Sequence, residues 1–132
     1  MTLSSSARRA LPICLAVAAA LAALLVASRD QPAQAAARTV KLTADPHGKL
    51  AFTRTRVTTR AGTVTLLLRN PKSAGLPHGI AIEGKGLDKD GKVVTAGKTS
   101  RVTVTLKRGT YEYYCPITAH KRAGMKGKLI VR

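Results

Sequence analysis

From residue 38 onward the chain repeats one local pattern, short runs of alternating polar and apolar residues that end at turn signals. In residues 99–106 the alternation places Val102, Val104 and Leu106 on one face, because successive strand side chains point to opposite sides. The other runs are residues 38–43, 49–52, 53–59, 63–69, 76–83, 110–114 and 126–131. Seven or eight short strands without a helical period predict an all-β chain, an antiparallel β-sandwich with Greek-key crossings.

Three stretches of this pattern have features of their own. The three consecutive leucines within residues 63–69 predict deeper burial than a single alternating face provides. Residues 53–59 are rich in Thr and Arg and predict an edge strand, where charge deters unwanted pairing. Residues 84–92 predict a solvated, glycine-rich turn. The motif at 88–91 resembles a calcium loop only superficially, because its Gly comes too early and no Glu closes it.

The first 35 residues differ from the rest of the chain. They carry Arg8 and Arg9, then an apolar stretch at 11–27, then the small-residue motif Ala-Gln-Ala at 33–35. This order is typical of an export signal with a cleavage site; an uncleaved membrane anchor is the alternative, although 17 apolar residues are few for a span. We therefore predict a signal peptide or anchor helix at 1–35 and one domain at 36–132. The domain would be periplasmic, extracytoplasmic or secreted, or membrane-associated through residues 11–27.

The two cysteines have different contexts. Cys14 lies within the predicted export segment, where we interpret it as a small apolar residue. Cys115 is then the single thiol of the exported domain, which excludes an internal disulfide. A free thiol is a liability in an oxidising compartment unless something holds it. A bound metal would do so.

Metal-ligating residue types gather near the C-terminus. Cys115, His120 and Met125 follow the spacing Cys-x4-His-x4-Met, which suits a loop between two strands, and His78 lies far upstream. One thiolate, two imidazoles and a weak axial thioether form the donor set of a blue-copper electron-transfer site. Each residue alone has an ordinary explanation as a buried or loop side chain. His47, in a turn signal, is expected at the surface.

These residues resemble the motif of the cupredoxin family, of the plastocyanin, azurin and amicyanin kind. His78 lies in Pro-His-Gly-Ile, Cys115 follows Tyr-x-Tyr-Tyr, and Gly124-Met125-x-Gly127 closes the motif. The resemblance covers roughly residues 38–132 and implies a cupredoxin-like sandwich that binds one copper through His78, Cys115, His120 and Met125. Two departures stand out. Gly79 replaces the Asn that often follows the first His, and residues 118–119 are Thr-Ala where Pro-Gly is common.

The function that the resemblance implies is single-electron transfer by an exported protein, expected to be a monomer and not an enzyme. The sequence leaves two alternatives open. One is copper storage or delivery with the same ligands, and the other is a metal-free basic β-sandwich that binds polyanions or the cell surface. No specific nucleic-acid partner is expected, because no regular aromatic series accompanies the Lys and Arg residues. Tyr111 and Tyr113 share a strand face with Cys115, so we expect them to pack inside the sandwich.

The charge of the chain is strongly positive. Of its 23 Lys and Arg residues 20 lie past residue 35, together with 5 of the 6 acidic residues, for a formal charge of about +15 there. In the family the second loop histidine lies near the surface, so His120 is the expected electron exit. Lys121 and Arg122 directly follow it, and Lys126 and Lys128 lie a little further along the chain. An acidic redox protein, or a membrane oxidase or reductase with an acidic face, is the partner that such charge would steer. General solvation of the surface is the alternative.

Overall fold

A computed structural model describes residues 36–132 of the chain, and the predicted signal or anchor at 1–35 lies outside the described residues. The elements are β1 (Arg38–Thr43), β2 (Arg56–Thr59), β3 (Gly62–Arg69), η1 (Lys72–Ala74), β4 (Ala81–Gly84), β5 (Leu87–Asp90), β6 (Thr99–Leu106), β7 (Gly109–Tyr114), α1 (Thr118–Arg122) and β8 (Lys126–Val131). Within residues 36–132, no helix has the length and apolar character needed to cross a bilayer. The prediction of an all-β domain is confirmed.

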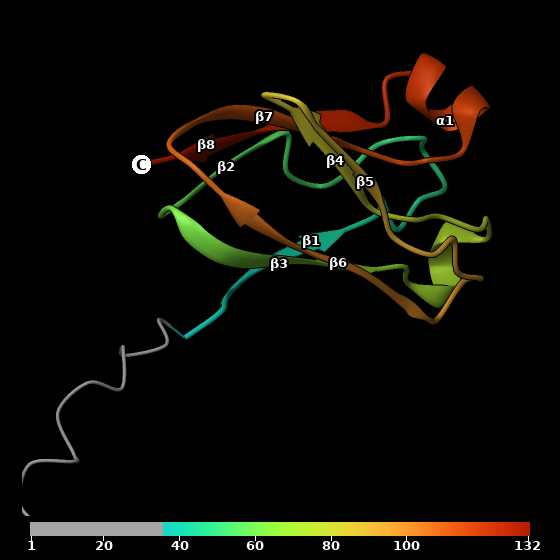
Figure 1. Cartoon of the computed structure of the whole chain (residues 1–132). Helices are drawn as coiled ribbons and strands as arrows, with labels where there is room; N and C mark the ends of the chain where they lie inside the picture. The colour runs from blue at the N-terminus through green and yellow to red at the C-terminus, as the bar shows by residue number, and fades with distance from the viewer. Residues whose placement is uncertain (1–35) are drawn as a thin grey trace, which may run out of the picture. The chain divides into compact units, whose positions relative to one another are not determined.

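The strands form two sheets that face each other as layers (Figure 1). One sheet has the order β1-β3-β6, and the other has the order β2-β8-β7-β4-β5. Most neighbours are antiparallel, but β1 pairs with β3 in parallel, and β2 pairs with β8 in parallel. The β1–β3 pair is parallel because the chain crosses to the opposite sheet for β2 before it returns for β3. The edge position predicted for β2 is confirmed.

The core lies between the inward faces of the two sheets. In β6 the burial of residues alternates strictly from Thr99 to Leu106, as the polar and apolar pattern of the sequence predicts. Two of the three consecutive leucines, Leu66 and Leu68, are fully buried, and Leu67 is half-buried. Tyr111 and Tyr113 belong to the same apolar cluster as Cys115, as the period of two predicts.

The predicted turn at residues 84–92 is wrong in part, because Leu87–Asp90 forms the edge strand β5. This strand has little sequence signal, since only Leu87 is half-buried and its other residues are exposed. It forms by pairing with β4, from Ala81↔Asp90 to Gly84↔Leu87. The connecting turn needs positive φ angles at Gly84, Lys85 and Gly86, which two glycines adopt without steric cost.

Three predicted strands are shorter than their patterns. Of residues 53–59 only Arg56–Thr59 forms a strand, and the strand predicted at 76–83 begins only at Ala81, as β4. Residues 49–52 contribute a single bridge, Ala44↔Phe52. The loop before β4 forms one isolated bridge, His78↔Val94.

Candidate metal centre

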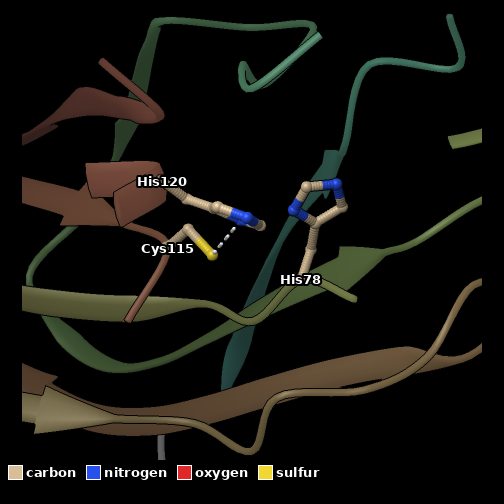
Figure 2. A group of neighbouring side chains, drawn as sticks. All are labelled: His78, Cys115 and His120. Atoms are coloured by element: carbon tan, nitrogen blue, oxygen red, sulfur yellow. Dashed lines mark hydrogen bonds between the residues drawn. The ribbon is translucent and has the colours of Figure 1, made fainter. Parts of the chain in front are cut away.

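Three of the predicted ligand side chains meet at one end of the sandwich. His78 comes from the loop before β4, Cys115 directly follows β7, and His120 lies on α1. Their ligating atoms all lie within 4.8 Å of one another. Figure 2 shows the two imidazoles facing each other, with the Cys115 Sγ directed at His120 Nδ1 across 3.7 Å. His78 thus forms one compact cluster with residues that lie 37 and 42 positions further along the chain.

The cluster is withdrawn from water. His78 and Cys115 are fully buried, and His120 is half-buried. Burial, and secondarily the charge of His120, hold the pKa of His78 below its usual value, which favours the neutral imidazole that metals bind. Among residues 36–132, neither ring nitrogen of His78 finds a hydrogen-bond partner. Buried polar atoms in native proteins nearly always have partners, so these orphaned nitrogens fit a metal that binds there.

Met125 is also fully buried, and backbone hydrogen bonds connect it to Cys115 and His120. The Cys115 N–H donates to the Met125 carbonyl at 3.0 Å, and the Met125 N–H donates to the His120 carbonyl at 3.0 Å. These two bonds close the loop between β7 and β8. The position of Met125 is therefore coupled to both Cys115 and His120, whatever its side chain binds.

The loop that we expected between Cys115 and Met125 contains a short helix. Thr118–Arg122 forms α1, which Figure 1 shows at the end of the sandwich. Its first residues are the Thr-Ala pair found where Pro-Gly is common in the cupredoxin motif. The His120 N–H donates to the Ile117 carbonyl at 2.9 Å.

Gly79 has a steric reason in this chain. A Cβ added at Gly79 would lie 3.0 Å from Pro116 Cγ and 3.2 Å from the Lys92 carbonyl oxygen. A larger residue would therefore displace the Pro116 ring or the backbone. Gly79, directly after His78, thus packs against Pro116, directly after Cys115. This contact joins the two segments at the position where an asparagine is common in the cupredoxin motif.

Asn70 supports the His78 loop, and the sequence pattern did not reveal this role. Its side chain is fully buried and donates from Nδ2 to the Leu76 carbonyl at 2.9 Å and to the Val94 carbonyl at 3.2 Å. Val94 in turn exchanges two backbone hydrogen bonds with His78, at 2.9 and 3.0 Å. Asn70 thus connects both sides of the only bridge that holds His78 within the described residues. Its place beside Pro71 indicated a loop and nothing more.

The cations beside His120 are not equivalent. Lys121 Nζ donates to Glu83 Oε2 at 2.8 Å and also lies over the Tyr114 ring, while Arg122 is exposed on the same helix. Lys126 lies 3.7 Å from Glu112, and Lys128 is exposed. The structure therefore distinguishes an engaged Lys121 from an exposed Arg122, which their adjacent positions in the sequence do not. His47 is exposed, as its turn signal predicts.

Three auracyanin structures show similarity to this chain. Auracyanin B is 27% identical over 73% of this chain and 89% of its own, with a TM-score of 0.64. An auracyanin from the photosynthetic bacterium Roseiflexus castenholzii is 23% identical over 73% and 98%, with a TM-score of 0.63. Auracyanin A, a "blue" copper protein from the green thermophilic photosynthetic bacterium Chloroflexus aurantiacus, is 22% identical over 71% and 98%, with a TM-score of 0.59. The latter two establish the fold alone. No curated protein matches.

The family comparison covers most of the sequence. Residues 16–131 match the family described as "Cupredoxin-like domain". This match agrees with the two-layer sandwich and with the His, Cys and His side chains gathered at one end of it. The chain belongs to the family of cupredoxin-like domains.

Proposed function

We propose that this chain is an exported type 1 copper protein that carries single electrons between redox partners. One observation carries the proposal: a buried thiol and two imidazoles place their ligating atoms within 4.8 Å, and both ring nitrogens of the buried imidazole lack other partners among residues 36–132. When bound, copper supplies a Cu(I)/Cu(II) couple, for which thiolate and thioether suit the reduced state and imidazole suits both. Membership of the cupredoxin-like family supports the same chemistry here.

In this proposal the four side chains divide the work. Cys115 would provide the thiolate, His78 and His120 the two imidazoles, and Met125 a weak thioether donor. The backbone bonds between Cys115, His120 and Met125, together with the bridge at His78, hold these residues without help from a metal. A site held in this way needs little rearrangement when the electron moves. It also favours a reversible carrier over a catalyst.

The proposed route for electrons passes through His120, the most exposed of the three clustered side chains. It lies on α1, whose residues are all at least partly open to solvent. Arg122, two residues after His120 on this helix, is exposed and offers positive charge to an acidic redox protein or to the acidic face of a membrane oxidase or reductase. Lys121 contributes less to such steering, because Glu83 partly neutralises it.

We further propose that residues 1–35 direct export or anchor the chain, and that residues 36–132 act outside the cytoplasm as one copper-binding domain. The described residues, 36–132, form one compact unit, which supports treating them as a single domain. Mass spectrometry of the protein recovered from an exporting host would test this. A start near residue 36 is expected after cleavage, whereas an intact N-terminus in the membrane fraction would indicate an anchor.

The direct test of the copper proposal is an absorption spectrum of the chain loaded with Cu(II). We expect one copper per chain and an intense band near ~600 nm, as thiolate-to-copper charge transfer produces in trigonal sites of this kind. Reduction with ascorbate should remove the band and reoxidation should restore it. A colourless Cu(II) form, or tight zinc binding without redox activity, would refute the proposal.

A further inference from the structure

The helix that carries His120 has little apolar anchorage of its own. None of the residues of α1 (Thr118–Arg122) is buried, and no side chain among residues 36–132 caps its N-terminus at Ile117. Five residues are also far too few for a helix that is stable alone. Contacts outside α1 therefore keep His120 within reach of Cys115, and the bond from the Met125 N–H to the His120 carbonyl is one of them.

The side chain of Lys121 supplies contacts to the rest of the sandwich. Its Nζ donates to Glu83 Oε2 at 2.8 Å, and the same nitrogen lies 3.5 Å from the centroid of the Tyr114 ring. Glu83 belongs to β4 and Tyr114 to β7, so one cation connects α1 to two strands. The Lys121 and Glu83 side chains are 33% and 35% exposed, so water screens this ion pair only in part.

The Tyr114 ring is itself held in place. Its hydroxyl group donates to Asp88 Oδ1 at 2.8 Å and lies 3.2 Å from Asp90 Oδ1. Both carboxylates belong to β5, the strand that the sequence pattern did not reveal. Tyr114 also pairs with Ala81 across β4 and β7. The surface under Lys121 is therefore fixed by three neighbouring strands.

We propose that Lys121 is a positioning residue that clasps α1 against β4 and β7 and so holds His120 against Cys115. We name the set Lys121, Glu83 and Tyr114 the lysine clasp. The assignment of His120 as a ligand rests on the proposed function. The lysine clasp rests on the contacts of Lys121 with Glu83 and Tyr114, which do not depend on a metal. Lys121 thus has a role that its place in a basic sequence, next to the similar Arg122, does not suggest.

The test measures how often the end of the sandwich opens in the copper-free full-length chain. Cys115 is fully buried, so iodoacetamide reaches its thiol only when the loop opens. Modification is followed at Cys115 by peptide mass spectrometry, because Cys14 is a second thiol in the chain. When reclosing is fast relative to labelling, the labelling rate reports the population of the open form.

Lys121→Met keeps most of the alkyl stem and removes both charged contacts. An ion pair and a cation–π contact together are worth enough to change an equilibrium about 5- to 30-fold, so we expect Cys115 labelling to accelerate by about that factor. Arg122→Met is the matched control, because it removes one exposed cation from the same helix. We expect it to change the labelling rate by less than about two-fold.

Two further variants identify the contacts. Lys121→Arg keeps a cation, so Cys115 in this variant should be labelled nearly as slowly as in the wild-type chain. Glu83→Gln should accelerate labelling less than Lys121→Met, since the contact with the Tyr114 ring survives. The double variant Lys121→Met with Glu83→Gln should label no faster than Lys121→Met alone, because both substitutions break the same contact.

Urea unfolding of the same variants separates a local clasp from a general loss of stability. We expect the labelling rate of Lys121→Met to rise far more than its global unfolding equilibrium. Equal changes in both, equal effects of Lys121→Met and Arg122→Met, or no effect of Lys121→Met would each overturn the proposal. None of these outcomes depends on copper, so a failed clasp and a failed copper proposal are distinguishable.

Discussion

The β1-β3-β6 sheet and the metal end of the domain are built in different ways. In the sheet, apolar side chains alternate inward, and the half-exposed Thr65 and the exposed Thr103 share a hydrogen bond on the outer face. The buried polar side chains of residues 36–132 are Asn70, which directly follows β3, His78, in the loop before β4, and Ser100, near the start of β6. Ser100 accepts from the Ile80 N–H and donates to the Lys92 carbonyl. Apolar burial thus stabilises the sandwich, while buried hydrogen bonds position the residues that would bind copper.

The largest expected effect separates the chemistry from the fold. Cys115→Ser should abolish the intense visible band of the copper-loaded chain, because no other side chain near the cluster supplies a thiolate. The sheets should form as before, since the substitution changes one atom. Absorption near ~600 nm and far-ultraviolet circular dichroism check the two statements. An intense blue form of the serine variant would show that the thiolate is misassigned.

The converse substitution is in the sheet. Leu66→Ala removes a fully buried side chain from β3 and should lower the free energy of unfolding by about 2–5 kcal/mol. The visible band of the protein that remains folded should keep its position, because Leu66 is an apolar residue of β3 and not one of the proposed copper ligands. Urea unfolding and a spectrum below the transition measure both quantities. A shifted band would mean that the two regions are coupled through the core.

Met125→Leu tests the axial assignment within the metal end. The variant should stay blue and have a higher reduction potential, because it loses a weak donor that favours Cu(II). Spectroelectrochemistry of both proteins gives the comparison. If Met125→Leu lost copper as completely as Cys115→Ser, the thioether would be a main ligand and our axial assignment would fail.

Asn70→Ala and Thr103→Val compare polar groups in the two regions. Asn70→Ala removes the donor to the part-buried Leu76 and Val94 carbonyls and should cost about 1–3 kcal/mol of unfolding free energy. Thr103→Val removes a hydrogen bond that water can replace and should cost less than about 1 kcal/mol. Asn70→Ala should also accelerate copper loss, whereas Thr103→Val should not. Equal effects of the two would remove the distinction drawn between the regions.

The smallest expected effect is on partner recognition. Arg122→Glu should slow electron transfer to an acidic partner several-fold at low salt, with the colour and potential nearly unchanged. Added salt should slow the wild-type protein as well, because screening limits steering to about 10 Å at 0.1 M. Stopped-flow rates across ionic strengths provide the measurement. A rate that stayed constant or rose with salt would argue against steering by positive charge.

Much of the sandwich was predictable because its strands carry a local signal. The alternation at Thr99–Leu106 can be seen in the sequence of that segment alone, and the bounds of β6 agree with it. β5 was missed because Asp88, Lys89 and Asp90 are exposed, so no apolar pattern marks them. α1 was missed for a similar reason, since a helix without a buried residue has no apolar face to detect.

The sequence by itself determined the residue types that can bind a soft metal, their order along the chain, and the strand pattern that separates His78 from Cys115. Only the tertiary structure decided which polar groups support them. Asn70 and Val94 lie 24 residues apart, and Lys121 and Glu83 lie 38 apart. Local patterns report how each segment faces the core, whereas contacts at such separations exist only after the strands have paired. The steric reason for Gly79 is of the same kind, because Pro116 reaches it only in the folded chain.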